Sequence, residues 1–403
     1  MASYIFINRF FWPDTSATSQ LLSDLAFDLA ASGHKIIVIT SRHLYNNEQC
    51  VLLVSEEHKG VKVLRIATTN FGRKHNLGRL IDYLSFYVST LLIVISVVHR
   101  GDVLIAKTDP PLLSIPLAAL SRIKAFHLVN WIQDLFPEVA ASAGMGVLSG
   151  GFGRLVTRVR DWSLRRAKAN ITIGEDMRRL LITRGIPSET LHVVYNWGHD
   201  SPAVTTPSAG LRSQWGLENN FVAMYSGNLG VAHDHLTLLG AMEALHEDDS
   251  IRFLFVGGGS KLTALQVQAH RLGLTNFVVK PLQPRELLAE SLAVGDIHLM
   301  SLQPAFDGQI VPSKYYGVLS AARPLVFIGS WDNSIAQEIR GEGLGATVLE
   351  GEVDALVEAL LKARDHPELC IEQGKRAHAI FEARYTRSLS LSRWSELLNH
   401  IAT

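Results

Sequence analysis

The chain has 403 residues, of which 47% are hydrophobic and 19% are charged. This length exceeds that of one ordinary domain, and the composition favours large buried cores over long disordered segments, so we predict two globular domains. Lys and Arg together equal Asp and Glu at 38 each, which removes the global electrostatic argument for a nucleic-acid-binding protein. Any anion-binding site must therefore be local.

Cysteine usage and the first residues both favour a cytosolic protein. Cys50 and Cys370 lie far apart in the sequence and form neither a metal-ligand spacing nor a disulfide framework. The opening segment, MASYIFINRFFWP, lacks a charged region followed by a long apolar run and a cleavage site. We therefore interpret this segment as a first strand and not as an export signal.

Short runs rich in Ile and Val alternate with helical patterns along the first half of the chain. Buried parallel strands have this continuous apolar character, and the alternation of strands with helices is typical of a Rossmann-like domain. The predicted strands are residues 4–8, 34–40, 61–66, 102–107, 126–130, 169–173 and 191–195.

Two helical segments of this half have open interpretations. Within the helix predicted at 77–98, Tyr83 to Val98 has no charged residue over 16 positions. A spanning helix needs about 20 apolar residues, so a core helix, a helix that touches a membrane with one face, and a transmembrane span all remain open. The Arg-rich run 154–168 is either a solvated face or a patch for anionic lipid headgroups.

The same alternation restarts after a polar stretch at 198–210, which we interpret as a linker. The sequence thus predicts an α/β protein with two Rossmann-like domains, 1–198 and 211–403, that face each other across a cleft with ligands at the carboxyl ends of the strands. The final helix, 388–402, can pack on either domain. The predicted strands of the second half are residues 221–227, 251–257, 276–280, 296–301, 324–329 and 345–350.

Glycine-containing loops follow three strands of the second half: YSGNLG (225–230), VGGGSKL (256–262) and the segment from Gly308. Glycine lets the backbone approach a ligand closely, although VGGGS is also a plain turn pattern. A helix predicted to start near Pro312 would attract anions with its free amides, and Lys314 adds a positive charge there. We interpret this segment as a phosphate site, with a solvated lysine as the alternative.

Five sequence blocks, in this order, resemble retaining nucleotide-sugar glycosyltransferases of the GT-B fold, family 4. The resembling branch assembles bacterial surface polysaccharides such as colanic acid and O-antigen. The blocks are FFWPDTSATSQLLSDLAFDLAASGHKIIVIT, WIQDLFPE, MYSGNLGVAHDH, FVGGGSKL and VPSKYYGVLSAARPLVFIG. The resemblance implies transfer of a hexosyl or N-acetylhexosaminyl group from a nucleoside diphosphate to a lipid-linked glycan. It also implies retention of configuration, no metal or other cofactor, and a cytoplasmic protein lying peripherally on the inner membrane.

The resemblance places the donor in the C-terminal domain and the acceptor in the N-terminal domain. Asp134 and Lys314 are the implied catalytic residues, because a carboxylate can orient or deprotonate a hydroxyl and a cation can stabilise a leaving diphosphate. For Asp134, a role in the turn alone is the alternative. The implied donor-binding residues are Gly227, Asn228, His233, Gly258, Lys280, Leu282, Gln309, Ile310, Val311, Ser313 and Lys314. The implied acceptor-binding residues are Ser16, Thr18, Asp134 and Glu138.

Several positions depart from the family pattern. The two glutamates that the family commonly carries fall on Gln309 and Gly317, and its diphosphate-binding Arg and Lys fall on Asn228 and His233. These departures keep two alternatives open: a catalytically silent GT-B partner that binds a nucleotide sugar, and a GT-B nucleotide-sugar epimerase. His233 and His235 are two apart on a predicted helix and face different ways, so we predict no metal site there.

Overall fold

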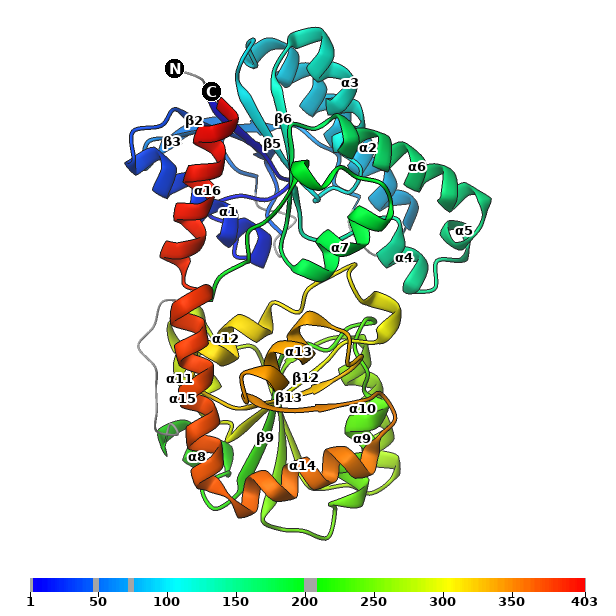
Figure 1. Ribbon diagram of the computed structural model, residues 1–403, viewed down its shortest axis with the longest axis vertical. Helices are drawn as coiled ribbons and strands as arrows, with labels where there is room; N and C mark the ends of the chain where they lie inside the picture. The colour runs from blue at the N-terminus through cyan, green and yellow to red at the C-terminus, as the bar shows by residue number, and fades with distance from the viewer. Residues whose placement is uncertain (1–2, 46–50, 72–75, 199–208, 403) are drawn as a thin grey trace. The chain divides into compact units, whose positions relative to one another are not determined.

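The computed structural model describes residues 3–45, 51–71, 76–198 and 209–402 (Figure 1). The chain forms two compact units, one of Met1–Tyr195 with Ser390–Thr403 and the other of Asn196–Leu389. The predicted α/β class with two Rossmann-like domains is confirmed. The final helix contributes Ser390 onward to the N-terminal unit, while most of the predicted linker lies outside the described residues.

The N-terminal unit is built on an eight-stranded sheet with the order β3-β4-β2-β1-β5-β6-β7-β8. All seven predicted strands form, and every neighbouring pair is parallel except β3 and β4. The prediction missed β3 because its sequence, SEEH, is polar and lies at the sheet edge. The strands are β1 Tyr4–Ile7, β2 Ile36–Ser41, β3 Ser55–His58, β4 Val61–Ile66, β5 Val103–Lys107, β6 His127–Ile132, β7 Ala169–Thr172 and β8 Leu191–Val193.

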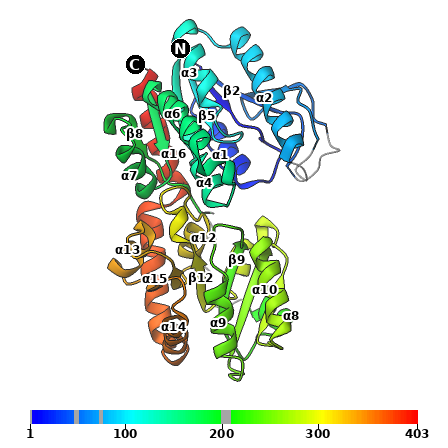
Figure 2. The same cartoon turned by 90° about the vertical axis from the view of Figure 1, so that its right-hand side faces the viewer.

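Helices cover both faces of this sheet (Figures 1 and 2). The helices α2, α3 and α6 lie side by side on one face, as right-handed crossovers between parallel strands require. The C-terminal helix α16 lies on the other face, where Trp394 packs against Trp131 with ring centroids 4.7 Å apart. The helices are α1 Ala17–Ala31, α2 Asn76–Val97, α3 Ser114–Lys124, α4 Glu138–Ser142, α5 Gly146–Ser149, α6 Gly151–Arg166, α7 Glu175–Thr183 and α16 Arg387–Ala402.

The C-terminal unit is built on a six-stranded parallel sheet with the order β11-β10-β9-β12-β13-β14. Its strands are β9 Phe221–Asn228, β10 Ile251–Gly258, β11 Phe277–Lys280, β12 Ile297–Ser301, β13 Leu325–Ile328 and β14 Gly345–Val348. Its helices are α8 Ala209–Trp215, α9 Leu236–Ala244, α10 Ser260–Arg271, α11 Leu288–Leu292, α12 Lys314–Ser320, α13 Ser334–Gly341, α14 Val353–Asp365 and α15 Pro367–Arg384.

The strand order of each sheet reverses next to its first strand, between β1 and β5 in one unit and between β9 and β12 in the other. The crossover helices leave such a position in opposite directions, so a crevice opens at the carboxyl ends of the two strands, and open α/β sheets bind their ligands there. The topology therefore directs the search for a site to the loops that follow β1, β5, β9 and β12.

Candidate functional site

The reversal point of the C-terminal sheet carries a cluster of Tyr225, His233 and Lys314. Tyr225 lies on β9, His233 follows β9, and Lys314 is the first residue of α12, which follows β12. The Nζ atom of Lys314 lies 3.6 Å from the centroid of the Tyr225 ring and also contacts the Tyr225 hydroxyl. The ring of His233 stands edge-on to the Tyr225 ring, and its Nδ1 atom is hydrogen-bonded to the carbonyl of Ser301 at the end of β12.

Burial controls the protonation of this cluster. It lowers the pKa of Lys314 well below its usual value, and no carboxylate among the described residues opposes that shift. Burial and, secondly, the charge of Lys314 lower the pKa of His233 to about 4. Lys314 is half-buried and lies against the Tyr225 ring, which favours the anion-site interpretation over a solvated lysine. An anionic ligand would supply the opposite charge that this amine lacks and would favour its protonated form.

The helix predicted to start near Pro312 forms, with Ser313 as its N-cap and Lys314 as its first residue, and α12 has seven residues. So short a helix adds little dipole, and the side chain of Lys314 is therefore the stronger anion-binding feature. Ser313 is the N-cap residue and is exposed, and Gln309 donates from Nε2 to the carbonyl of Ala305 at 2.6 Å. Ile310 and Val311 are half-buried in the loop between these positions.

The glycine loops after β9 and β10 lie side by side because the two strands pair as far as Gly227 with Gly257 and Asn228 with Gly258. Gly257 has φ 141°, and a Cβ atom there would lie 2.3 Å from the carbonyl oxygen of Gly227. The close approach of the two strands therefore explains this glycine without a ligand. This agrees with the interpretation of VGGGS as a plain turn. Gly258 is exposed and has open space around it, and a Cβ atom at Gly227 would lie 3.9 Å from Cε of Lys314.

The remaining donor candidates lie at or after the ends of β9 and β11, and the histidine pair lies before α9. Lys280 ends β11, and Leu282, which is 64% exposed, follows it. The prediction of His233 and His235 on one helix was wrong, because His233 lies in a loop and His235 is the N-cap of α9. Asn228 is exposed at the end of β9.

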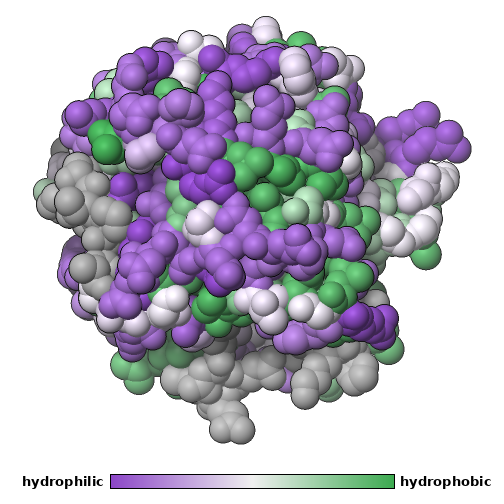
Figure 3. Space-filling model, turned by 90° about the horizontal axis from the view of Figure 1, so that it is seen from below, coloured by the Kyte–Doolittle hydropathy of each residue, from purple (hydrophilic) through white to green (hydrophobic). Residues whose placement is uncertain are grey.

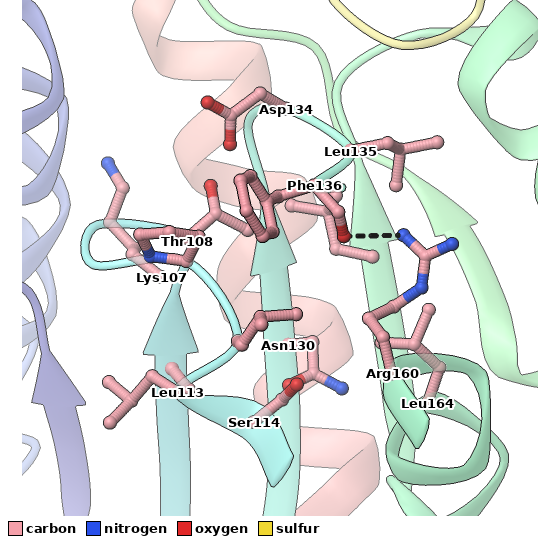
Figure 4. Close-up of a pocket in the computed structure, with 14 residues that line it drawn as sticks. Lys107, Thr108, Leu113, Ser114, Asn130, Asp134, Leu135, Phe136, Arg160 and Leu164 are labelled. Carbon is pink, nitrogen blue, oxygen red and sulfur yellow. Dashed lines mark hydrogen bonds between the residues drawn. The ribbon is translucent and has the colours of Figure 1, made fainter. Parts of the chain in front are cut away.

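In the N-terminal unit, Asp134 lies in the loop after β6 and borders a cavity of about 30 Å³, large enough for water but not for a sugar (Figure 4). Burial raises the pKa of Asp134, while hydrogen bonds from Thr108 and from its own backbone amide oppose that shift. Thr108 follows β5, so the two loops meet at this carboxylate. A raised pKa suits proton transfer near neutral pH, and the hydrogen bond to the backbone also fits the turn role.

Sequence analysis missed Lys107, the last residue of β5. Its Nζ atom lies 3.8 Å from the centroid of the Trp131 ring and donates to the carbonyl of Thr18 at 2.9 Å. Burial lowers the pKa of Lys107 to about 7, and the charge of Asp109 opposes this shift. The sequence signal for this residue was a single charge, Lys107, at the carboxyl end of the otherwise apolar strand β5. Lys107 thus ties the β5 loop to the start of α1.

The two acceptor candidates near the start of α1 lie in this same region. Ser16 is the N-cap residue of α1, and its amide donates to the Asp14 carboxylate at 2.8 Å. Thr18 is half-buried in the first turn and binds Lys107 through its carbonyl. Both residues therefore lie on the loop side of β1, at the reversal point of the N-terminal sheet.

Glu138 is held by structural ion pairs. Its carboxylate lies 2.6 Å from Arg160 and 2.8 Å from Arg184, and Arg160 also pairs with Asp161 at 2.7 Å. The side chains of Glu138 and Arg160 are 10% and 5% exposed. Because Arg160 belongs to the Arg-rich run, the solvated-face interpretation of that run is wrong for this residue.

We expect Glu138→Gln to lower the free energy of unfolding by about 1–3 kcal/mol, because it leaves a buried guanidinium with one carboxylate fewer. Urea denaturation of the full chain measures the loss. Glu175→Gln is the control, since its carboxylate pairs with Arg178 at 3.5 Å on an exposed helix and contributes little. Equal stability of the Glu138 variant and the wild type would contradict the structural role.

The sequence is similar to those of known glycosyltransferases. Residues 18–197 match the glycosyl transferase 4-like domain. The chain is 25% identical over 366 residues to WcaI of Escherichia coli K12, described as a colanic acid biosynthesis glycosyl transferase, and the match covers 87% of this chain and 89% of WcaI.

Two solved structures share the fold along the whole length. Sucrose-phosphate synthase of Thermosynechococcus elongatus superimposes with a TM-score of 0.77 at 14% identity, covering 100% of this chain and 99% of that one. HepE of Anabaena, solved with UDP-glucose, gives a TM-score of 0.71 at 17% identity and covers 99% of this chain and 100% of its own. The match of residues 18–197, the full-length relative and the two Rossmann-like units agree: this chain has the GT-B fold, and it is similar to glycosyltransferases of family 4.

Proposed function

We propose that the protein transfers a sugar from a nucleoside diphosphate to a lipid-linked glycan acceptor in surface polysaccharide biosynthesis. The main support for a nucleoside-diphosphate donor is the amine of Lys314, which lies at the strand reversal point of the C-terminal sheet. Burial lowers the pKa of this amine, and it has no carboxylate partner among the described residues. HepE, whose structure holds UDP-glucose, supports this kind of donor, and WcaI supports a polysaccharide product.

The chemistry assigns a role to each unit. The acceptor hydroxyl oxygen attacks the anomeric carbon, the bond from that carbon to the diphosphate breaks, and the hydroxyl proton passes to the leaving diphosphate. Lys314 stabilises the charge that grows on the diphosphate. Exposed backbone at Asn228 and Gly258 contacts the same group. Asp134 orients the reacting hydroxyl, near Ser16 and Thr18. In this proposal configuration is retained and no metal takes part, so EDTA leaves the rate unchanged.

An assay for released nucleoside diphosphate tests the proposal against its alternatives. The purified protein is incubated with UDP-, GDP- and dTDP-sugars, with and without lipid-linked glycan extracted from a bacterial membrane. Acceptor-dependent release supports transfer. Interconversion of the donor sugar alone indicates an epimerase, and stabilisation by a nucleotide without turnover indicates a silent partner. A thermal-shift screen across the three nucleotides selects the donor, because a ligand that binds the native state raises its stability.

The buried lysine predicts that diphosphate binding weakens as pH rises. The charged form of Lys314 binds the anion, whereas burial holds the pKa of the free protein down, so above that pKa binding requires uptake of a proton. Below the pKa of the free protein the lysine is already charged, and the dependence disappears. Calorimetric titration in two buffers with different ionisation enthalpies measures the uptake. Lys314→Met should abolish it, and uptake that persists in the variant would assign the proton to another group.

A further inference from the structure

The helix α2 has two apolar faces, and the protein covers one of them. Phe86 and Val94 are fully buried against the sheet, and Asp82, on the same side, is 1% exposed and bonds Thr69 and the amide of Phe71. These contacts fix α2 to the domain. The helix is long and apolar enough to cross a membrane by composition, but its inward contacts oppose its release for a span.

The opposite face of α2 exposes a continuous apolar stripe. The members of the stripe are between 38% and 70% exposed and recur every three or four positions, so they line one side of the helix. Only 22% of the 18-residue apolar window within Leu77–Val97 is buried. Most surfaces intersperse hydrophobic residues among hydrophilic ones, as on the face drawn in Figure 3, whereas a contiguous stripe marks an interaction site. The stripe consists of Leu77, Leu80, Ile81, Leu84, Val88, Leu92 and Ile95.

The charges on this side of the domain are segregated by sign. The helices α2, α3 and α6 carry two carboxylates, Asp82 and Asp161, which are only 1% and 6% exposed. The charged side chains that these helices expose are therefore all basic. The whole chain, by contrast, has equal numbers of basic and acidic residues. The basic residues that reach the surface are Arg79, Arg122, Lys124, Arg154, Arg158, Arg165 and Arg166.

The basic groups adjoin the stripe. Lys124, at the end of α3, donates to the carbonyl of Ile95 in α2 at 2.8 Å. The guanidinium of Arg166 lies 4.6 Å from the centroid of the Trp162 ring on α6. Arginine and tryptophan together suit the interface between lipid headgroups and acyl chains. An open pocket of about 420 Å³ beside α3 and α6 is lined by Ser121, Arg122, Trp162, Arg165 and Arg166.

We propose that the face of α2, α3 and α6 docks on an anionic lipid bilayer. The apolar stripe enters the boundary between headgroups and acyl chains, with α2 parallel to the membrane plane, and the arginines around Trp162 bind headgroup phosphates. An apolar surface with basic side chains and no exposed carboxylate on its own helices matches a negatively charged bilayer. A second copy of this chain would bring the same positive charges together. The inference does not rest on the sugar-transfer chemistry.

Co-sedimentation of the full chain with vesicles tests this proposal. We expect binding to phosphatidylcholine vesicles that contain phosphatidylglycerol, and binding that weakens with salt without disappearing, because salt screens the arginines and leaves apolar insertion intact. The double variant Leu84→Asn/Leu92→Asn should lower partitioning by about tenfold or more. Arg122→Glu/Arg158→Glu should lower it by a similar factor at low salt and by less at high salt.

Matched controls separate docking from folding and from self-association. Leu272→Asn/Ile371→Asn changes residues that are 48% and 61% exposed in the other unit and should leave vesicle binding unchanged. All variants should unfold at the temperature of the wild type, because the replaced side chains are exposed. Wild-type binding by the α2 variant would overturn the proposal. So would a dimer in sedimentation velocity that Leu84→Asn/Leu92→Asn dissociates.

Discussion

Replacement of Lys314 by methionine is expected to weaken nucleoside-diphosphate binding by about 1.5–3 kcal/mol, the range for hydrogen bonds to charged groups. Methionine preserves the apolar contact with the Tyr225 ring and removes the charge. Turnover should fall further, on the order of 10²–10³-fold, because charge grows on the diphosphate only as the sugar bond breaks. Titration calorimetry and single-turnover kinetics separate the two effects.

The free nucleoside provides an internal control for this prediction, since its affinity should hardly change when a diphosphate contact is lost. Lys375→Met, at an exposed position on α15, is the matched variant and should behave as the wild type. Lys314→Arg should recover part of the loss, because it retains the charge without the compact ammonium. Equal diphosphate affinity of wild type and Lys314→Met would move the anion site to the ends of β9 and β10.

Replacement of Asp134 by asparagine is expected to slow transfer by on the order of 10²-fold while leaving nucleotide binding nearly unchanged. The amide keeps the size of the carboxylate and the ability to accept from Thr108, but it lacks the negative charge that orients the reacting hydroxyl. Because burial raises the pKa of Asp134, the wild-type rate should fall on the acidic side as the carboxylate is protonated. The variant should lose this acidic limb.

The pH profile is the measurement that a turn role would not affect. If Asp134 only shapes its loop, Asp134→Asn should lower stability and leave the acidic limb of kcat/KM in place. Asp28→Asn, on α1, is the control for a half-buried aspartate of the same unit without a resolved role in the site. A variant with near-normal turnover would leave Asp134 as a turn residue.

Strands were readable from the sequence wherever burial made them continuously apolar, as in residues 36–41 and 251–258. The edge strand β3 was not, because its backbone pairing with β4 carries the interaction while its side chains stay polar. The start of α12 was also readable, since the predicted start near Pro312 lies next to the N-cap Ser313.

The site was predictable residue by residue but not as an arrangement. Sequence analysis proposed Lys314 and His233 individually, whereas their meeting over Tyr225 depends on β9 and β12 being neighbours in the sheet. The burial of Lys107 was likewise hidden, since a lysine at the end of a strand usually points to solvent. For α2, uniform apolarity allowed three placements, and only the packing shows which face the domain covers.

The path of the chain also constrains the order in which the protein can mature. The N-terminal unit includes Ser390–Thr403, which are made only after the entire second unit, Asn196–Leu389. Until that last helix emerges from the ribosome, Trp131 lacks the indole of Trp394 and Tyr4 lacks its hydrogen bond to Asn399. The half of the protein translated first is therefore completed last, and the two halves cannot be separated by a single cut without leaving the first incomplete.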